Sequence, residues 1–359
     1  MRSLAIEKYC KPQDYEILDL PVPEIKSADE LLIKVHAGSI NPVDVKVATG
    51  AMKTFWPVPM PLKLGHDLSG TVIAVGSDVP GHFKPGTEVY SRSPEYCSGT
   101  VSEYALSTAS TTALKPSSLS HIQAAAIPLA SLTALQALDA ADKNIDGGLK
   151  GKKVLIPGGL SGTGSIAIQL AKNVFGASKV ITTLSTAKAA KAESLLGEGV
   201  VDQIIDYTKN DMAAVIPRGS VDFMFDTMGQ ALASLHLIKK GGMIVSVSSL
   251  PFGSDLKDLA PNMPAIIRWT LNSIGAVSKY RARRYGVDYS CLFMRPSAAD
   301  LTRLSGWIEE GKLKPVVGRV TGLENLKEIR EGCEEVLSGK GGTGKFVIKI
   351  GAISHGGGA

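Results

Sequence analysis

The sequence predicts an α/β protein in which a doubly wound parallel sheet forms the middle and two β-rich parts form the ends. With 359 residues, 44% of them hydrophobic and 20% charged, the chain is long enough for two domains with separate cores. Short apolar runs broken by Pro and Gly fill its first third. Beyond residue 150, strand-like and helix-like segments alternate, which is typical of a parallel sheet covered on both faces.

The first part, to about residue 125, contains short strand-like runs at 30–37, 70–75 and 87–90. Turn residues separate these runs, and this pattern favours a compact β-rich domain. The pattern changes at 122–141, which is rich in Ala and Leu.

The middle part predicts a run of buried strands with helices between them. The strands are expected at 153–156, 179–184, 203–206, 223–226 and 243–247, and helices at 165–175 and 187–196. A helix at 298–310 and a last strand at 345–350 complete the molecule.

The most specific motif follows the first of these strands. The apolar run 154–156 enters a loop with four glycines, and a helical pattern begins at once. The first free N–H groups of a helix attract an anion, and glycines let a pyrophosphate come close. This order of strand, glycine loop and helix predicts a dinucleotide site. The glycines are Gly158, Gly159, Gly162 and Gly164.

Charge and cysteine usage exclude several classes of function. A formal charge of +5 is a mild excess, and its one local cluster, within 279–284, is interpreted as a solvated face, so no nucleic acid partner is expected. The four cysteines form no C-x-x-C pair, which argues against a disulfide framework. No signal peptide or apolar run of membrane-span length is found. These observations predict a cytoplasmic protein with no membrane span.

Several sequence blocks, in order, resemble the medium-chain dehydrogenase/reductase superfamily. The resemblance is strongest to its zinc-independent branch, which holds quinone oxidoreductases and enoyl reductases. The blocks are AGSINPVD at 37–44, LGHDLSGTV at 64–72, VG at 75–76, KPG at 84–86, LTA at 132–134, GGLSGTG at 158–164, FDTMG at 225–229 and GK at 344–345.

The resemblance implies a GroES-like catalytic domain, an inserted Rossmann domain and a chain end that returns to the first domain. The boundaries expected are 1–125 for the first part of the GroES-like domain, 126–296 for the Rossmann domain and 297–359 for the return. It also implies an active site in the cleft between the domains and a possible homodimer.

No metal site is expected. Zinc enzymes of this superfamily hold the catalytic ion with a Cys, a His and a second Cys, often with an acid beside the His. The matching positions are Asn41, His66 and about Leu129, with Asp67 as the acid. Because both thiolates are missing, the set is a poor zinc site. His66 is interpreted either as a packed histidine or as a group near the substrate.

The expected cofactor is NADPH. NAD-specific Rossmann folds usually end the second strand with an acid that binds the ribose 2′-OH. Here Ser185, Lys188 and Lys191 follow that strand, and the resemblance adds Tyr207 after the next one. It also places Thr133 and Lys345 near the cofactor. The full set predicted for the cofactor is Thr133, Gly159, Ser161, Gly162, Thr163, Gly164, Ser185, Lys188, Tyr207, Thr227, Ser246 and Lys345.

Without a metal to polarise an isolated carbonyl, the chemistry favours an apolar conjugated enone or enoyl compound, or a quinone. Asn41 is the candidate for orienting a carbonyl, and the proton donor is left open between Lys46, His66 and solvent. Two alternatives are an alcohol or ketone dehydrogenase with altered metal ligands, and a catalytically silent NADPH-binding regulatory protein. The segment 261–285 fits the family pattern least, and a packed helix is favoured there over a pocket wall.

Overall fold

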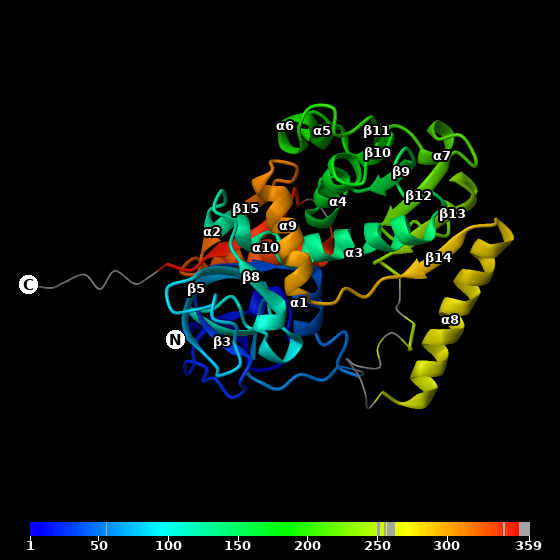
Figure 1. Cartoon of the computed structure of the whole chain (residues 1–359). Coiled ribbons are helices and arrows are strands. Elements are labelled where there is room, and N and C mark those ends of the chain that lie inside the picture. The colour runs from blue at the N-terminus through cyan, green and yellow to red at the C-terminus, as the bar shows by residue number, and fades with distance from the viewer. Residues whose placement is uncertain (55, 250–251, 255, 257–262, 340–341, 352–359) are drawn as a thin grey trace, which may run out of the picture. The chain divides into compact units, whose positions relative to one another are not determined.

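The computed structural model describes all residues except 55, 250–251, 255, 257–262, 340–341 and 352–359 (Figure 1). The chain divides into two compact units. Unit 1 comprises Met1–Leu129, Pro296–Glu309 and Val317–Ala359, and unit 2 comprises Ala130–Arg295 and Glu310–Val316. A β-rich unit and an α/β unit are therefore present, and the predicted fold class is confirmed.

Unit 1 contains two sheets in its described residues. The smaller has the order β2-β1-β4, and the larger has the order β15-β16-β3-β5-β6-β8, with β7 also paired to β3. The strands are β1 (Arg2–Ile6), β2 (Glu16–Asp19), β3 (Glu30–Ile40), β4 (Leu62–Lys63), β5 (Asp67–Val75), β6 (Glu88–Arg92), β7 (Tyr104–Thr108), β8 (Thr112–Leu114), β15 (Val317–Gly322) and β16 (Lys345–Lys349).

Helices and 3-10 turns connect these strands. They are α1 (Pro42–Ala48), α2 (His121–Ala125), α9 (Ala298–Glu309), α10 (Leu326–Ser338), η1 (Pro12–Asp14), η2 (Glu95–Cys97) and η3 (Ala109–Thr111). Alternation along β3 sends Leu31, Ile33 and Val35 into one core with Leu68 and Val72 of β5.

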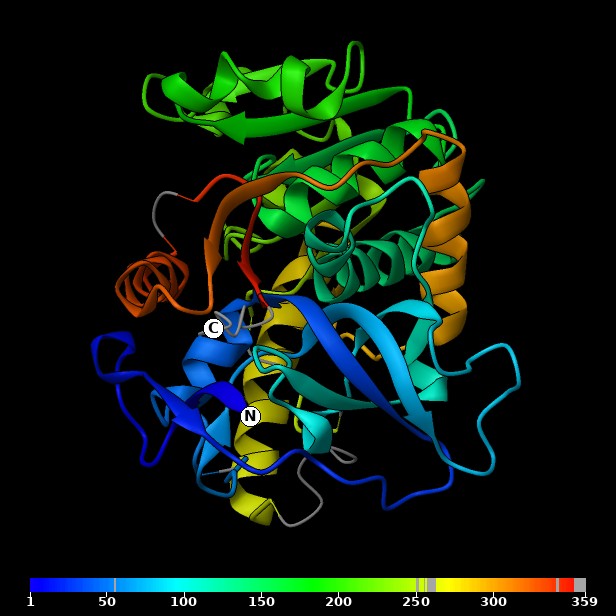
Figure 2. The ribbon, with the colours of Figure 1, turned by 90° about the vertical axis from the view of Figure 1, so that its left-hand side faces the viewer.

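The end of the chain completes this sheet. Strand β16 pairs antiparallel with β3, so that Phe346 lies opposite Ile40, and β15 pairs parallel with β16. Helix α10 contacts both β15 and β16 (Figure 2). The register places Lys345, the first residue of β16, next to the residues at the carboxyl end of β3.

Unit 2 is built on one parallel sheet of six strands with the order β11-β10-β9-β12-β13-β14. Numbered along the chain this order is 3-2-1-4-5-6, which is the order of a doubly wound dinucleotide-binding fold. The strands are β9 (Lys153–Pro157), β10 (Lys179–Leu184), β11 (Gln203–Asp206), β12 (Val221–Asp226), β13 (Ile238–Ser246) and β14 (Asp288–Cys291).

The helices of unit 2 follow its strands. They are α3 (Pro128–Asn144), whose first two residues belong to unit 1, α4 (Gly162–Asn173), α5 (Thr186–Ala189), α6 (Ala192–Leu196), α7 (Met212–Val215) and α8 (Ala265–Arg284), with the 3-10 turn η4 (Leu235–Leu237). Helix α4 packs on β9 and β10. The single helix expected at 187–196 is two short helices, because α5 ends at Ala189 and α6 begins at Ala192.

A short segment after α9 belongs to unit 2, although the sequence assigned everything beyond residue 296 to the first domain. Hydrogen bonds explain the difference. Gln169 of α4 donates to the carbonyl of Lys314 at 3.0 Å and accepts from its N–H at 2.9 Å. Asn173 donates to the carbonyl of Lys312 at 2.8 Å. Two amide side chains on one helix therefore hold Glu310–Val316 against the parallel sheet.

Candidate functional site

The loop between β9 and α4 is shaped by close approaches that only glycine allows. Gly158 has a φ of +68°, in the left-handed region. A Cβ on Gly159 would collide with Thr182 Oγ1 and lie 2.6 Å from Ile168 Cδ1, and one on Gly164 would collide with the carbonyl oxygen of Gly158. Two threonines of β10, missed by the sequence analysis, line this loop.

Those threonines fix the loop by hydrogen bonds. Thr182 Oγ1 donates to the carbonyl of Ile156 at 2.6 Å, and Thr183 Oγ1 accepts from the N–H of Gly158 at 3.1 Å. On the other side, Thr227 Oγ1, predicted to contact the cofactor, donates to the carbonyl of Pro157 at 2.9 Å. The loop is thus held from both neighbouring strands before any ligand binds.

The N-terminus of α4 offers donors to an anion. Ser161 caps the helix, since its Oγ accepts from the N–H of Gly164 at 3.0 Å and its carbonyl accepts from Ser165. Among the described residues, no acceptor is found for the N–H groups of Gly162 and Thr163. The positive end of a twelve-residue helix and two open N–H groups suit a pyrophosphate.

The turn after β10 carries the groups predicted for a 2′-phosphate. Ser185 and Lys188 are both half-buried there, while Lys191 and Tyr207 are exposed. Desolvation lowers the pKa of Lys188. An anion beside this ammonium would offset that desolvation, which is consistent with the predicted role.

An acid does stand beside this turn, although it ends the third strand and not the second. Asp206 accepts hydrogen bonds from the hydroxyl of Thr186 and from the N–H and hydroxyl of Thr208. These bonds lower its pKa to about 2. Because both carboxylate oxygens are engaged by threonines, Asp206 orders the two turns.

The loop after β12 depends on Asp226, which is fully buried. Its carboxylate accepts from the N–H groups of Met228, Gln230 and Ala231 at 2.9–3.1 Å. Ser246, predicted to contact the cofactor, donates its hydroxyl to the same carboxylate at 2.9 Å and is buried. Ser246 therefore supports the loop that carries Thr227.

Thr133 lies on α3 and is buried. Of the cofactor residues predicted in unit 2, those of the glycine loop and Thr227 follow the carboxyl ends of β9 and β12, and Ser246 is the last residue of the neighbouring strand β13. Ligands of doubly wound sheets bind at this edge. Their roles in binding remain predictions.

Unit 1 holds a second cluster, in which His66 and Asp44 form a buried pair. His66 is 5% exposed, and its Nδ1 contacts Asp44 Oδ1. The other oxygen of Asp44 accepts from the N–H of Asn41 at 2.6 Å. Within the described part of the chain, His66 Nε2 is buried with no hydrogen-bond partner. A ring held at one nitrogen and open at the other can hold or deliver a proton there.

Sequence reasoning missed Asp44, although its place was visible. Asn41 precedes Pro42 at the start of α1, and Asp44 stands three residues after Asn41, the spacing at which a side chain reaches back to the N-cap N–H. The same Pro-led helix start therefore positions the carboxylate that faces His66.

The second buried group of this cluster centres on Asp67. Its Oδ2 accepts from Ser39 Oγ at 3.1 Å and Asn41 Nδ2 at 2.8 Å, and it forms an ion pair with Lys345 Nζ at 3.3 Å. Its Oδ1 accepts from the N–H of Leu129 at 2.9 Å. Lys345 Nζ also donates to Asn41 Oδ1. In unit 1 the ammonium predicted to contact the cofactor is thus bound to a carboxylate.

Of the two predicted site residues Asn41 and Lys46, only Asn41 lies in this cluster. Asn41 is 2% exposed and bridges Asp67 and Lys345, whereas the Lys46 side chain is exposed on α1. Asn41 Nδ2 carries a second hydrogen beyond the one given to Asp67. The roles of both residues in catalysis remain predictions.

The donor set of this cluster does not fit zinc. His66 is the only imidazole or thiolate at the three positions considered, because Asn41 offers an amide and Leu129 a backbone N–H that Asp67 already accepts. In the described residues, no group of three or more His, Cys, Asp or Glu side chains could hold a metal ion. Metal-free chemistry remains a prediction.

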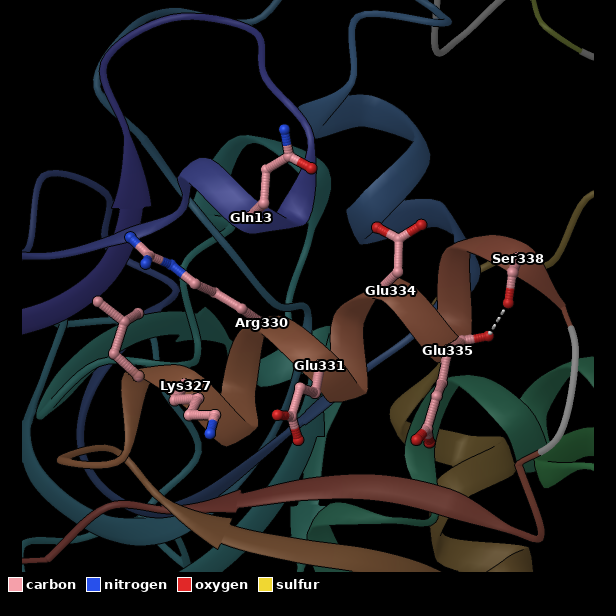
Figure 3. A pocket seen from close by; sticks show the side chains of 8 residues that line it. Gln13, Lys327, Arg330, Glu331, Glu334, Glu335 and Ser338 are labelled. Carbon is pink, nitrogen blue, oxygen red and sulfur yellow. Dashed lines mark hydrogen bonds between the residues drawn. The ribbon is translucent and has the colours of Figure 1, made fainter.

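A surface pocket of about 650 Å³ lies elsewhere in unit 1, between η1 and α10 (Figure 3). None of the predicted site residues lines it. Arg330 donates to the carbonyl of Tyr15 at 2.7 and 2.9 Å, and Arg319 pairs with Glu331 and Glu335. These charged side chains hold α10 in place, which explains their presence without a ligand.

Comparisons with known proteins agree with this architecture. Residues 27–117 match the alcohol dehydrogenase GroES-like domain, and residues 201–348 match the zinc-binding dehydrogenase family. The chain is 34% identical over 305 residues to an NADPH-dependent alkenal/one oxidoreductase, chloroplastic, from Arabidopsis thaliana, covering 83% of this chain and 67% of the relative.

Two further relatives extend over almost the whole chain. The NAD(P)H oxidoreductase RTN4IP1, mitochondrial, from Mus musculus is 30% identical over 371 residues, covering 98% of this chain and 89% of the relative. The quinone oxidoreductase from Coxiella burnetii has a solved structure with a TM-score of 0.79 and 30% identity, covering 98% of this chain and 99% of that chain. The predicted GroES-like and Rossmann architecture is confirmed.

The predicted cytoplasmic location is wrong. The relatives in mouse, cattle, human and worm are named as mitochondrial, and the Arabidopsis relative as chloroplastic. The cysteine spacing on which that prediction rested does not distinguish one reducing compartment from another. Separately, no helix in the described part of the chain has the length and apolar character to cross a bilayer.

Proposed function

Because the chain belongs to the medium-chain dehydrogenase/reductase superfamily, we propose that it is an NADPH-dependent reductase of conjugated C=C bonds or quinones that works without a metal. The observation that carries the proposal is the glycine loop before α4, with a basic and hydroxylic turn in place of an acid after β10. Relatives named as an alkenal/one oxidoreductase and a quinone oxidoreductase support the substrate class.

The residues of unit 2 fit this cofactor. The open N–H groups of Gly162 and Thr163 would take the pyrophosphate, and Ser185 with Lys188 would take the 2′-phosphate. When bound, NADPH supplies the hydride that adds to the β-carbon of the substrate. The proposal expects no acid directly after β10, because its negative charge would repel the 2′-phosphate.

The His66–Asp44 pair supplies the proton in this proposal. Asp44 accepts from Nδ1–H, and this fixes the orientation of the ring and directs Nε2 away from the carboxylate. In the protonated ring, Nε2–H can donate to the developing enolate, and the proton then completes the α-carbon. Asp44 acts as a positioning residue because it reaches the reaction only through His66.

Asn41 orients the substrate carbonyl through the hydrogen of Nδ2 that Asp67 leaves open. Lys345 and Asp67 hold its amide from two sides. In this proposal Lys345 supports Asn41 within unit 1. That role does not require Lys345 to contact the cofactor.

A substrate panel tests the proposal. Loss of NADPH absorbance is followed with α,β-unsaturated ketones, enoyl thioesters, quinones and simple saturated ketones. We expect turnover of conjugated compounds or quinones and none of simple ketones. Turnover of simple ketones alone, or tight NADPH binding without oxidation by any compound, would overturn it in favour of a dehydrogenase or a silent binding protein, respectively.

His66→Gln tests the proton donor. We expect kcat to fall about 100-fold to 10,000-fold with an unchanged Kd for NADPH, because general acid catalysis contributes on that order. Asp44→Asn should lower kcat less, because the imidazole is still present and only its orientation is lost. The exposed His82→Gln serves as the control. A His66→Gln enzyme with wild-type kcat would remove this role.

We also propose that the protein is a homodimer. It is supported by the resemblance and by β14, which ends the parallel sheet of the described residues. Sedimentation of the full chain should give twice the monomer mass of 37.7 kDa. Monomeric behaviour at micromolar concentration would contradict it.

A further inference from the structure

Helix α8 is unusual in composition, and neither site described above uses it. Its 20 residues, AIIRWTLNSIGAVSKYRARR, contain five Lys or Arg and no Asp or Glu. Three of the cations, Arg281, Arg283 and Arg284, lie exposed in its last turn. Figure 1 shows it as one continuous helix between β13 and β14.

One face of α8 carries large apolar side chains in the open. Ile266 is 73% exposed, Trp269 71%, Val277 58% and Tyr280 64%. At about 100° per residue these four positions lie within one third of the helix circumference. We call these four residues the apolar stripe, and large apolar side chains exposed on one face of a helix indicate an interaction surface.

The opposite face fastens α8 to its own unit. Gly275 and Ala282 are its only buried residues in the described structure, and they lie about half a turn away from the stripe. A Cβ on Gly275 would collide with the ring of Phe252, and Lys279 Nζ lies 4.3 Å from the centre of that ring. The sequence-based expectation of a packed helix therefore holds for one face only.

We propose that the apolar stripe of α8 binds the surface of an anionic lipid bilayer. A helix with basic residues and no acidic ones, with Trp and Tyr in its apolar face, has the composition of helices that lie in the headgroup region. Arginines in the last turn of α8 complement negative headgroups.

The charge of α8 argues against the α8 helix of a second copy as the occupant. Two such helices side by side would bring ten cations together with no acidic partner on either one. An acidic protein groove would satisfy the same charge and is distinguished from lipid by the experiment. The proposal rests on α8 alone, so it stands or fails independently of the proposed reductase activity.

Vesicle flotation of the full-length protein tests the proposal. Vesicles of phosphatidylcholine alone are compared with vesicles containing about 30% phosphatidylserine, at about 0.1 M and about 0.5 M salt. We expect binding to the anionic vesicles, weakening with salt, and at least about tenfold less binding to phosphatidylcholine alone. Equal binding to both compositions, or to neither, would overturn the proposal.

Two variants separate the apolar from the ionic contribution. Trp269→Ser/Tyr280→Ser and Arg281→Glu/Arg283→Glu should each reduce binding at least about tenfold, since each removes one half of the interaction. Lys11→Glu/Lys84→Glu changes the charge equally at exposed positions of unit 1 and should leave binding unchanged. All four changed α8 positions are exposed, so circular dichroism and NADPH binding should match the wild type.

The outcomes are distinguishable. Loss of vesicle binding in both α8 variants, with the control intact, supports the proposal. Full vesicle binding by both variants contradicts it. Absence of vesicle binding together with α8-dependent binding to an acidic protein would replace the lipid surface by a protein partner.

Discussion

The two clusters differ in what builds them. The site in unit 2 consists of backbone N–H groups and of positions where a side chain is missing, held by threonines of the neighbouring strands. The cluster in unit 1 consists of buried charges that satisfy one another, above all Asp67 and Lys345. A site made of backbone is sensitive to added atoms, whereas a site made of buried charge is sensitive to removed ones.

Removing a charge from unit 1 should have the largest effect on stability. Lys345→Met leaves Asp67 buried without its cation, so we expect the free energy of unfolding to fall by about 3–5 kcal/mol in urea titrations. Lys349→Met, at an exposed position of the same strand, should lower the free energy of unfolding by less than about 0.5 kcal/mol.

The double variant sharpens this result. Lys345→Met/Asp67→Asn removes both charges, and its loss should be smaller than the sum of the two single losses, because neither partner is left uncompensated. Strict additivity would show that the two residues do not interact as the structure indicates.

Adding a methyl group to the glycine loop of unit 2 should have the next largest effect. Gly159→Ala places a Cβ against Thr182 Oγ1, so we expect about 1–3 kcal/mol of destabilisation and a clear loss of NADPH affinity by titration calorimetry. Gly306→Ala is the control, since nothing lies within 4 Å of its Cβ position. NADPH affinity equal to wild type in Gly159→Ala would contradict a ligand seated on this loop.

Cofactor preference should change by a smaller amount. Lys188→Ala should weaken NADPH by about 10-fold to 100-fold and leave NADH within about twofold, because one charge-assisted hydrogen bond to the 2′-phosphate is lost. Lys179→Ala, at the start of β10, the strand that precedes α5, is the matched control. Equal losses for both cofactors would remove Lys188 from the phosphate site.

The smallest effect is expected from a pair of histidines in unit 1. The rings of His36 and His121 lie 4.3 Å apart, and burial lowers the pKa of each from 6.5. Each also meets a hydroxyl, and His121 meets Glu88 at 3.2 Å. The unfolded chain therefore takes up these protons first as the pH falls.

Stability contributed by the neutral pair is thus present above pH 6.5 and is lost as the pH falls from 6.5 through the lower folded values. His36→Gln/His121→Gln should flatten the dependence of Tm on pH between about pH 7 and about pH 5, and His82→Gln should keep the wild-type slope. An unchanged slope in the double variant would show that the pair does not titrate in this range.

The contrast between the clusters also explains what the sequence could predict. The glycine loop and the elements on either side of it lie within one short stretch and carry their own periodicity, so the strand before the loop, the loop and the helix after it were predictable. The resemblance extended the same prediction to the GroES-like unit.

The buried charges were not predictable in the same way. Lys345 and Asp67 are 278 residues apart, and nothing local indicates that they meet. Asp44 and Asp226 read as ordinary residues of a helix start and a strand end until the chain folds around them. The exposed apolar residues of α8 were likewise interpreted as part of a packed helix. Periodicity shows that a helix has an apolar face but does not show whether another part of the protein covers that face.

The most direct test of the central claim follows the transferred hydrogen. An α,β-unsaturated ketone is reduced with NADPH that carries deuterium at the transferable position, and the product is analysed by mass spectrometry and NMR. The account predicts a saturated ketone with deuterium on the β-carbon and a solvent hydrogen on the α-carbon. Deuterium on the former carbonyl carbon of an allylic alcohol, with the C=C bond intact, would contradict it.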